Sequence, residues 1–166
     1  MDEIEAILIS AIIGALLGAL LTGIVGWILD NGKRKQEQKN LARALIFEIE
    51  GNDHHVRGLV EHWKKEFKSP LDVKDPRAVP QRLFYSDGVF FINRKEIASF
   101  NNDLSSDLNK YFTLLQRAES ERMLIIDISS KDRNTAIAST QYMMKCLYEA
   151  DAITEKLKQE LQNEAN

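Results

Sequence analysis

The sequence predicts an all-helical protein, in which one N-terminal transmembrane helix precedes a cytoplasmic antiparallel bundle of three long helices and a short one. Three observations predict this fold. The residues from Ile4 to Leu29 are apolar, with Glu5 as the single ionisable exception. Beyond residue 35, apolar residues recur at spacings of three, four and seven, which is typical of amphipathic helices. No long alternating pattern typical of a β-strand is present. We therefore divide the chain into a transmembrane anchor, residues 1–30, and a cytoplasmic helical domain, residues 31–166.

The apolar run is long enough to cross a bilayer. Its 26 residues give about 39 Å of helix, against about 30 Å of hydrocarbon. A cleaved signal peptide would have a basic start, whereas this chain begins "MDEIEA". The basic stretch "KRKQEQK" follows the run, and basic flanks stay on the cytoplasmic side. We therefore expect a single-pass protein of the cell membrane with its N-terminus outside and Trp27 as an anchor at the cytoplasmic interface.

Small residues recur every four positions within the apolar run. One row comprises Ser10, Gly14, Gly18, Thr22 and Gly26, and a second row comprises Ala11, Ala15, Ala19 and Gly23. Residues four apart share one ridge of a helix, so the two rows form a smooth face that another helix can approach closely in lipid. Glycine costs about 1 kcal/mol relative to alanine in an exposed helix, so its repeated use indicates such a contact. We expect a homo-oligomer whose interface comprises Ser10, Gly14, Ala15, Gly18, Ala19, Thr22 and Gly26.

Periodicity and turn residues define the elements of the helical domain. "NGK" at residues 31–33 either interrupts the first helix or continues it. An amphipathic helix is predicted over residues 36–68, with an inward stripe of Leu41, Leu45, Ile49, Val56, Leu59, Trp63 and Phe67. The stretch "SPLDVKDPRAVP" contains all three prolines and is predicted to be a loop. In "RLFYSDGVFFI" we expect a short helix and a turn, whose aromatic side chains Phe84, Tyr85, Phe90 and Phe91 cap the core.

Two further long helices complete the predicted bundle. The first covers residues 94–128 and starts with a capping box of Asn93 and Glu96. Its inward stripe comprises Ile97, Phe100, Leu104, Leu108, Tyr111, Leu115 and Ala118. "AESER", with Glu119, Glu121 and Arg122, is expected to form a solvated face of this helix. After a turn at "SSKD", the last helix covers residues 132–162 and turns Ile137, Met144, Leu147, Leu157 and Leu161 inward.

The charge and the ionisable residues exclude several kinds of site. The net charge of -3 leaves no basic face for duplex nucleic acid. Cys146 is the single cysteine, so no internal disulfide forms. The histidines His54, His55 and His62 fall in one segment, but no second group of His or Cys completes a metal site. We expect no metal, no cofactor and a solvated helix face there.

Arg57 and His62 form an R-x4-H spacing that resembles the ribonuclease motif of HEPN domains, which are also all-helical. The resemblance implies that the two side chains would act together at a scissile phosphate of RNA, which makes them the candidate catalytic residues. On a regular helix, residues five apart point about 140° away from each other. Joint action would therefore need a bend, for example at Gly58, or a neighbouring subunit. We expect a structural role for both.

The order of the predicted elements also resembles that of known kinds of protein. A span, a short basic stretch, "LARALIFEIEGN" and later "DLNKYFTLLQRAESER" resemble small single-pass membrane-anchored all-helical proteins of unassigned function. The span, the small helical domain and R-x4-H also resemble the membrane-anchored accessory protein of type VI-B CRISPR systems, which implies a ring-like pore.

Three hypotheses for function follow from these patterns. The first is a membrane-anchored, self-associating interaction module without an evident catalytic site. Its partners would be the lipid bilayer, further copies of the chain and a cytoplasmic protein. The alternatives are an oligomeric pore or antiviral defence effector, and an anchored HEPN-like ribonuclease.

Overall fold

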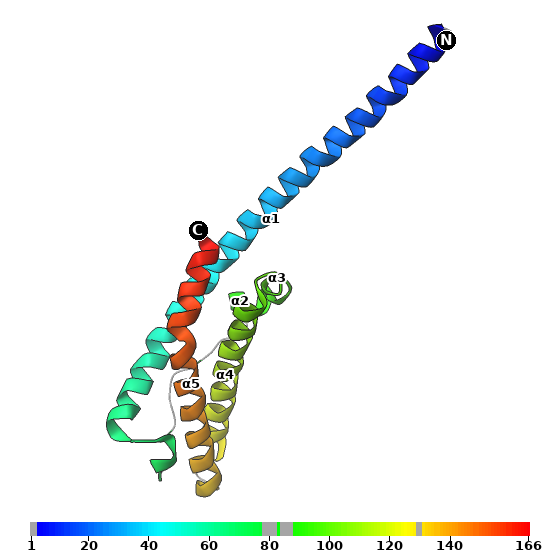
Figure 1. Cartoon of the computed structure of the whole chain (residues 1–166). Coiled ribbons are helices and arrows are strands. Elements are labelled where there is room, and N and C mark those ends of the chain that lie inside the picture. Colours follow the sequence, from blue (N-terminus) through cyan, green and yellow to red (C-terminus); the bar gives the residue numbers. More distant parts are fainter. Residues whose placement is uncertain (1–2, 78–82, 84–87, 129–130) are drawn as a thin grey trace. The chain divides into compact units, whose positions relative to one another are not determined.

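The elements of the structure, a computed structural model, are all helices. It describes residues 3–77, 83, 88–128 and 131–166, with side chains from residue 20 onward. In chain order the elements are α1 (Glu3–Glu66), the 3-10 helix η1 (Pro70–Asp72), α2 (Val89–Ile92), α3 (Arg94–Ile97), α4 (Asn102–Ile128) and α5 (Arg133–Ala165), as Figure 1 shows. No strand occurs in these ranges. The predicted all-helical class is confirmed, with three long helices but more than one short helix.

The chain divides into two compact units, Met1–Gln38 and Lys39–Asn166. The "NGK" stretch in the first unit continues the helix, because residues 31–33 all lie within α1. Within the described part of the chain, no helix is long and apolar enough to cross a membrane. The side chains of residues 4–19, which carry most of the predicted span, lie outside that part.

The second unit is an antiparallel arrangement of α4, α5 and the part of α1 from Lys39 onward. Polar contacts fix the direction of α1 against α5. Arg43 donates to the main-chain oxygen of Ala165 at 3.1 Å, whereas Lys64, at the other end, lies 3.3 Å from Asp151. Helices α4 and α5 lie side by side along their length (Figure 1) and are joined by a short connection after Ile128. Short connections produce antiparallel neighbours, as predicted.

The core of this unit follows the predicted stripes closely. Leu45, Ile49, Val56 and Trp63 of α1 are buried, and Leu41, Leu59 and Phe67 are partly buried against them. The buried line also runs through Ala42 and Val60. The predicted stripe of the middle segment, from Ile97 to Ala118, is buried at every position. On α5, Met144, Leu147, Leu157 and Leu161 are buried as predicted, whereas Ile137 is only partly buried.

Aromatic side chains cap the core, as expected, between α2 and α4. The ring of Phe90 is fully buried and stacks on Phe112, with centroids 4.1 Å apart and planes 13° from parallel. Phe91 meets both rings edge-on. Phe84 and Tyr85 lie outside the described residues.

The predicted single helix over residues 94–128 is wrong, because the chain breaks between α3 and α4. Ser99 and Phe100 donate their amides to carbonyls three residues earlier, which forms a tight turn and places Phe100 in the core. Helix α4 then begins afresh, with the Asn101 side chain accepting from the Leu104 amide at 2.8 Å. Phe100 is buried at the position that a continuous helix would also bury, so the spacing of apolar residues did not reveal the break.

The predicted capping box of Asn93 and Glu96 is also wrong. Asn93 precedes α3 but makes no side-chain cap there. Its amide group instead donates to the Val89 carbonyl at 2.8 Å and so completes the end of α2. A capping box forms elsewhere, at Ser69 and Asp72, where it starts η1 inside the predicted loop. Asp132 caps α5 by accepting from the Thr135 amide.

Candidate functional site

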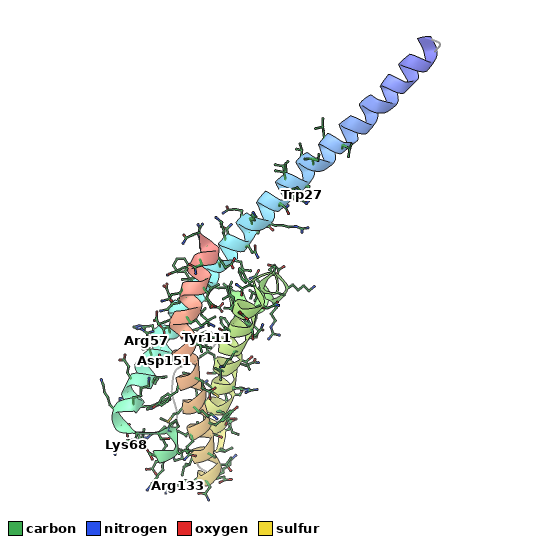
Figure 2. All side chains as sticks on the ribbon, viewed as in Figure 1. Trp27, Arg57, Lys68, Tyr111, Arg133 and Asp151 are labelled. Carbon is green, nitrogen blue, oxygen red and sulfur yellow. The ribbon has the colours of Figure 1, made fainter. Side chains whose placement is uncertain are left out.

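The first unit exposes large apolar side chains over a broad face of its helix. The exposed fractions lie between 52% and 67% for Leu20, Leu21, Ile24, Val25, Trp27, Ile28 and Leu29. Successive helix residues are rotated by about 100°, so these side chains cover about 200° of the circumference of the helix, and Thr22, Gly23 and Gly26 lie on the remaining side; Trp27 is labelled in Figure 2. Water-exposed apolar surface of this extent marks a site for lipid or for another protein.

The predicted small-residue interface is described in part. Thr22 and Gly26 lie on the exposed surface of the first unit. A Cβ atom built on Gly23 or Gly26 would meet nothing within 4 Å, so neither glycine is required by packing within its own chain. Ser10, Gly14, Ala15, Gly18 and Ala19 belong to α1, and their side chains lie outside the described residues.

Arg57, the first candidate catalytic residue, is held by carboxylates between α1 and α5. Its guanidinium lies 3.1 Å from Asp53, 2.5 Å from Glu155 and 3.9 Å from Asp151. Figure 2 shows Arg57 and Asp151 side by side. The hydrogen bond to Glu155, followed by the charge of Asp53, raises the pKa of Arg57 further above its usual range. Because its guanidinium binds carboxylates of both helices, Arg57 joins α1 to α5.

His62, the second candidate, lies apart from this network. Its side chain is 70% exposed, and its Nε2 atom is 3.7 Å from the carboxylate of Glu66, one turn along α1. The structure therefore does not bring Arg57 and His62 to one point within the chain. His54 and His55 are also exposed and meet each other edge-on. Among the described residues no three His, Cys, Asp or Glu side chains gather as a metal site.

Asp53 is a buried charge that sequence reasoning missed. It is 8% exposed and follows the core stripe of α1 between Ile49 and Val56. Lys158 of α5 lies 3.4 Å away, in addition to Arg57. The second carboxylate oxygen is buried without a hydrogen-bond partner. The predicted stripe has no apolar residue at the helical position between Ile49 and Val56, and Asp53 occupies that position. An acid on the inward face with Arg57 one turn later was the signal that could have indicated a buried ion pair.

A buried ion pair on α4 corrects the expectation for "AESER". Arg122 is 7% exposed and donates two hydrogen bonds to Glu119, of 2.9 and 2.7 Å. Glu119 also accepts from the backbone amide of Leu83 at 2.9 Å. The predicted solvated face is therefore wrong at these two residues, because their charges pair with each other and Glu119 also accepts from the Leu83 amide. Charge-assisted hydrogen bonds of this kind are among the stronger ones.

A hollow of about 460 Å³ opens between η1 and α5. Its lining comprises Ser69, Pro70, Leu71, Ala138, Gln141, Tyr142 and Lys145. Gln141 donates to the carbonyls of Leu71 and Val73 and so holds η1 in place beside the hollow. No conjunction of buried acids, bases or nucleophiles lies among these lining residues.

Glu48 connects α1 to α2. Its carboxylate accepts from the Phe90 amide at 2.8 Å. Burial raises the pKa of Glu48, against the opposing effect of hydrogen bonds from the Phe90 and Val89 amides. The carboxylate lies directly over Gly88: a Cβ atom there would be 1.8 Å from Glu48 Oε1. The absence of a side chain at Gly88 makes this contact possible.

We expect Gly88→Ala to destabilise the second unit by about 1–2 kcal/mol, because the carboxylate must leave an amide that is then unsatisfied. Chemical denaturation monitored by circular dichroism measures this loss. Gly51→Ala is the matched control. Gly51 is exposed in α1 with nothing within 4 Å of the new methyl group, so the same substitution should stabilise by up to about 1 kcal/mol. Equal effects at both positions would contradict the role of Glu48.

No protein-family model matches the chain, and no curated protein and no solved structure shows significant similarity to it.

Proposed function

We propose that the chain is a single-pass membrane protein whose first unit spans the bilayer and self-associates, and whose second unit is a cytoplasmic interaction module. The observation that carries the proposal is the broad face of exposed apolar side chains at residues 20–29. It continues the apolar run of the sequence that begins at Ile4. No charged side chain interrupts the run between Glu5 and Asp30, so this helix lacks the charged face of a soluble amphipathic helix, and a bilayer covers such a helix on every side.

The direction of insertion rests on the flanking charges. Four acids and no base occur in residues 1–30, whereas residues 31–45 hold five bases and one acid. Because basic flanks are retained in the cytoplasm, the second unit is placed on that side.

The binding role of the second unit rests on how its charges are used. Arg57 and Lys158 bind the carboxylates of Asp53 and Glu155, and Arg122 binds Glu119. The pairs Lys158–Asp53 and Arg57–Glu155 join α5 to α1, whereas Arg122 and Glu119 pair within α4. These charges are therefore used inside the bundle. The proposal is therefore a scaffold that presents its outer surface to a partner protein.

Cysteine labelling of intact cells tests insertion and direction together. Cys146 is 2% exposed, and burial raises the pKa of its thiol, so it reacts poorly wherever it lies. We therefore use a Cys146→Ala background. Asp2→Cys should react with a membrane-impermeant maleimide in intact cells, and Ala98→Cys, at an exposed position, should react only after lysis.

Two outcomes would contradict the proposal. The reverse labelling pattern would overturn the orientation. Release of the protein from membranes by alkaline carbonate would overturn the membrane span itself.

A further inference from the structure

We propose that Lys33, Arg34 and Lys35 form a collar that binds the headgroups of anionic phospholipids at the membrane surface. The inference rests on the proposed function, since it requires a first unit that spans a bilayer. It goes further by naming the chemistry of the lipid that the protein selects.

The three side chains are exposed and available. Lys33, Arg34 and Lys35 all lie on the surface of α1. Within the described residues none of them makes an ion pair, although Asp30 and Glu37 are close in sequence. A cation without a carboxylate partner keeps its full capacity for an external phosphate.

The next two bases along the chain are used differently. Lys39 donates to the main-chain oxygen of Asn166 at 2.5 Å, and Arg43 donates to that of Ala165 at 3.1 Å. Both therefore bind the C-terminal carbonyls of α5, where the helix dipole favours a positive charge. The basic stretch thus separates into three outward-directed cations and two that hold the bundle together.

The arrangement of the three cations favours a lipid surface over a protein or an RNA. Consecutive helix residues differ by about 100° in direction and 1.5 Å in height. The collar therefore spreads over about 200° of the circumference within about 3 Å along the axis. A layer of headgroups surrounds a helix at one level in this way, whereas a docked protein or nucleic acid strand would need bases along a single face.

The position along the helix is also suitable. Arg34 follows Leu29, the last residue of the apolar run, by five residues, or about 7.5 Å. The headgroup region extends about 5–8 Å beyond the hydrocarbon on each side of a bilayer. Long basic side chains reach such a layer while their methylene groups stay against apolar surface. Trp27, also exposed, lies at the hydrocarbon side of the same interface.

The test compares lipids around the reconstituted full-length protein. Spin-labelled phosphatidylglycerol and spin-labelled phosphatidylcholine are added separately to phosphatidylcholine bilayers that contain the protein, and the motionally restricted fraction gives a relative association constant. We expect the anionic lipid to be preferred by about fivefold or more, since each base near an anionic lipid surface contributes an effect of that order. The Lys33→Gln/Arg34→Gln/Lys35→Gln variant should lose the preference, and high salt should weaken it in the wild type.

A charge-matched variant provides the control. Lys65→Gln/Lys68→Gln/Lys74→Gln removes three exposed lysines of the second unit, none of which makes an ion pair among the described residues. This variant should keep the full preference. Lys33→Arg/Lys35→Arg should keep it too, because the charge is retained.

Each contrary outcome overturns a distinct statement. A preference that survives in the collar variant, or that is equally lost in the control, overturns the collar. So does equal association of the two lipids with a wild-type protein that floats with the vesicles. A wild-type protein that fails to float with any vesicle overturns the membrane proposal, and the collar with it.

Discussion

Gly18→Leu is expected to disrupt the homo-oligomer that we propose and to give smaller species, with the second unit still folded. Gly18 belongs to the small-residue row of Ser10, Gly14, Thr22 and Gly26. Helix association in lipid depends on close backbone packing, because apolar contact with another helix gains nothing over lipid tails. A leucine side chain on the ridge separates the two backbones and removes that packing. Multi-angle light scattering of the protein in detergent, corrected for bound detergent, measures the change in mass.

The matched control for this result is Gly32→Leu. Gly32 also lies in α1 but is off the ridge, and a side chain there meets nothing within 4 Å. The same substitution should leave the mass unchanged, and Leu17→Ala, outside the two small-residue rows, should have little effect. A loss of association in all three variants, or in none, would show that the ridge is not the contact.

Arg122→Ala is expected to destabilise the second unit by about 3 kcal/mol. Removal of one partner from a buried ion pair leaves the other charge without compensation. Glu119 would keep its hydrogen bond from the Leu83 amide but lose both bonds to the guanidinium. The hydrogen bond between Leu83 and Glu119 would then be held less firmly. Urea denaturation gives the free energy of unfolding.

Arg117→Ala provides the comparison for Arg122→Ala, on the same helix and with the same change of charge. Arg117 is exposed, so its removal should change the stability by less than about 0.5 kcal/mol. Similar losses from Arg117→Ala and Arg122→Ala would mean that helix propensity or net charge, rather than the buried pair, explains the effect.

Much of the bundle could be predicted from local sequence patterns. The inward stripes of α4 and α5 recur at helical spacing, and both segments are helical, although the first stripe also runs across the break between α3 and α4. The end of α4 and the start of α5 were marked by "SSKD", where Asp132 caps the next helix. Such features depend on residues close in sequence, so the chain displays them directly.

The errors occurred where a side chain found a partner other than the one that the local pattern suggests, either four residues away or in a distant segment. Asn93 and Glu96 fit a capping box, but the side chain of Asn93 found the Val89 carbonyl as a partner. Glu119 and Arg122 read as solvated because charge predicts exposure. The amide of Leu83, 36 residues earlier, donates to Glu119, and Arg122 is buried beside it.

The sequence by itself determined the helical class, the inward faces of the long helices and the charge asymmetry around the apolar run. Those properties follow from side chains that repeat with the period of a helix. Only the tertiary structure decided which charges act inside the bundle. Asp53 meets Lys158 across 105 positions of sequence, and Arg57 binds Glu155 of α5 instead of meeting His62. The physical reason is that an ion pair depends on which segment packs against which. Periodicity shows the face that a helix buries but not the partner that buries it.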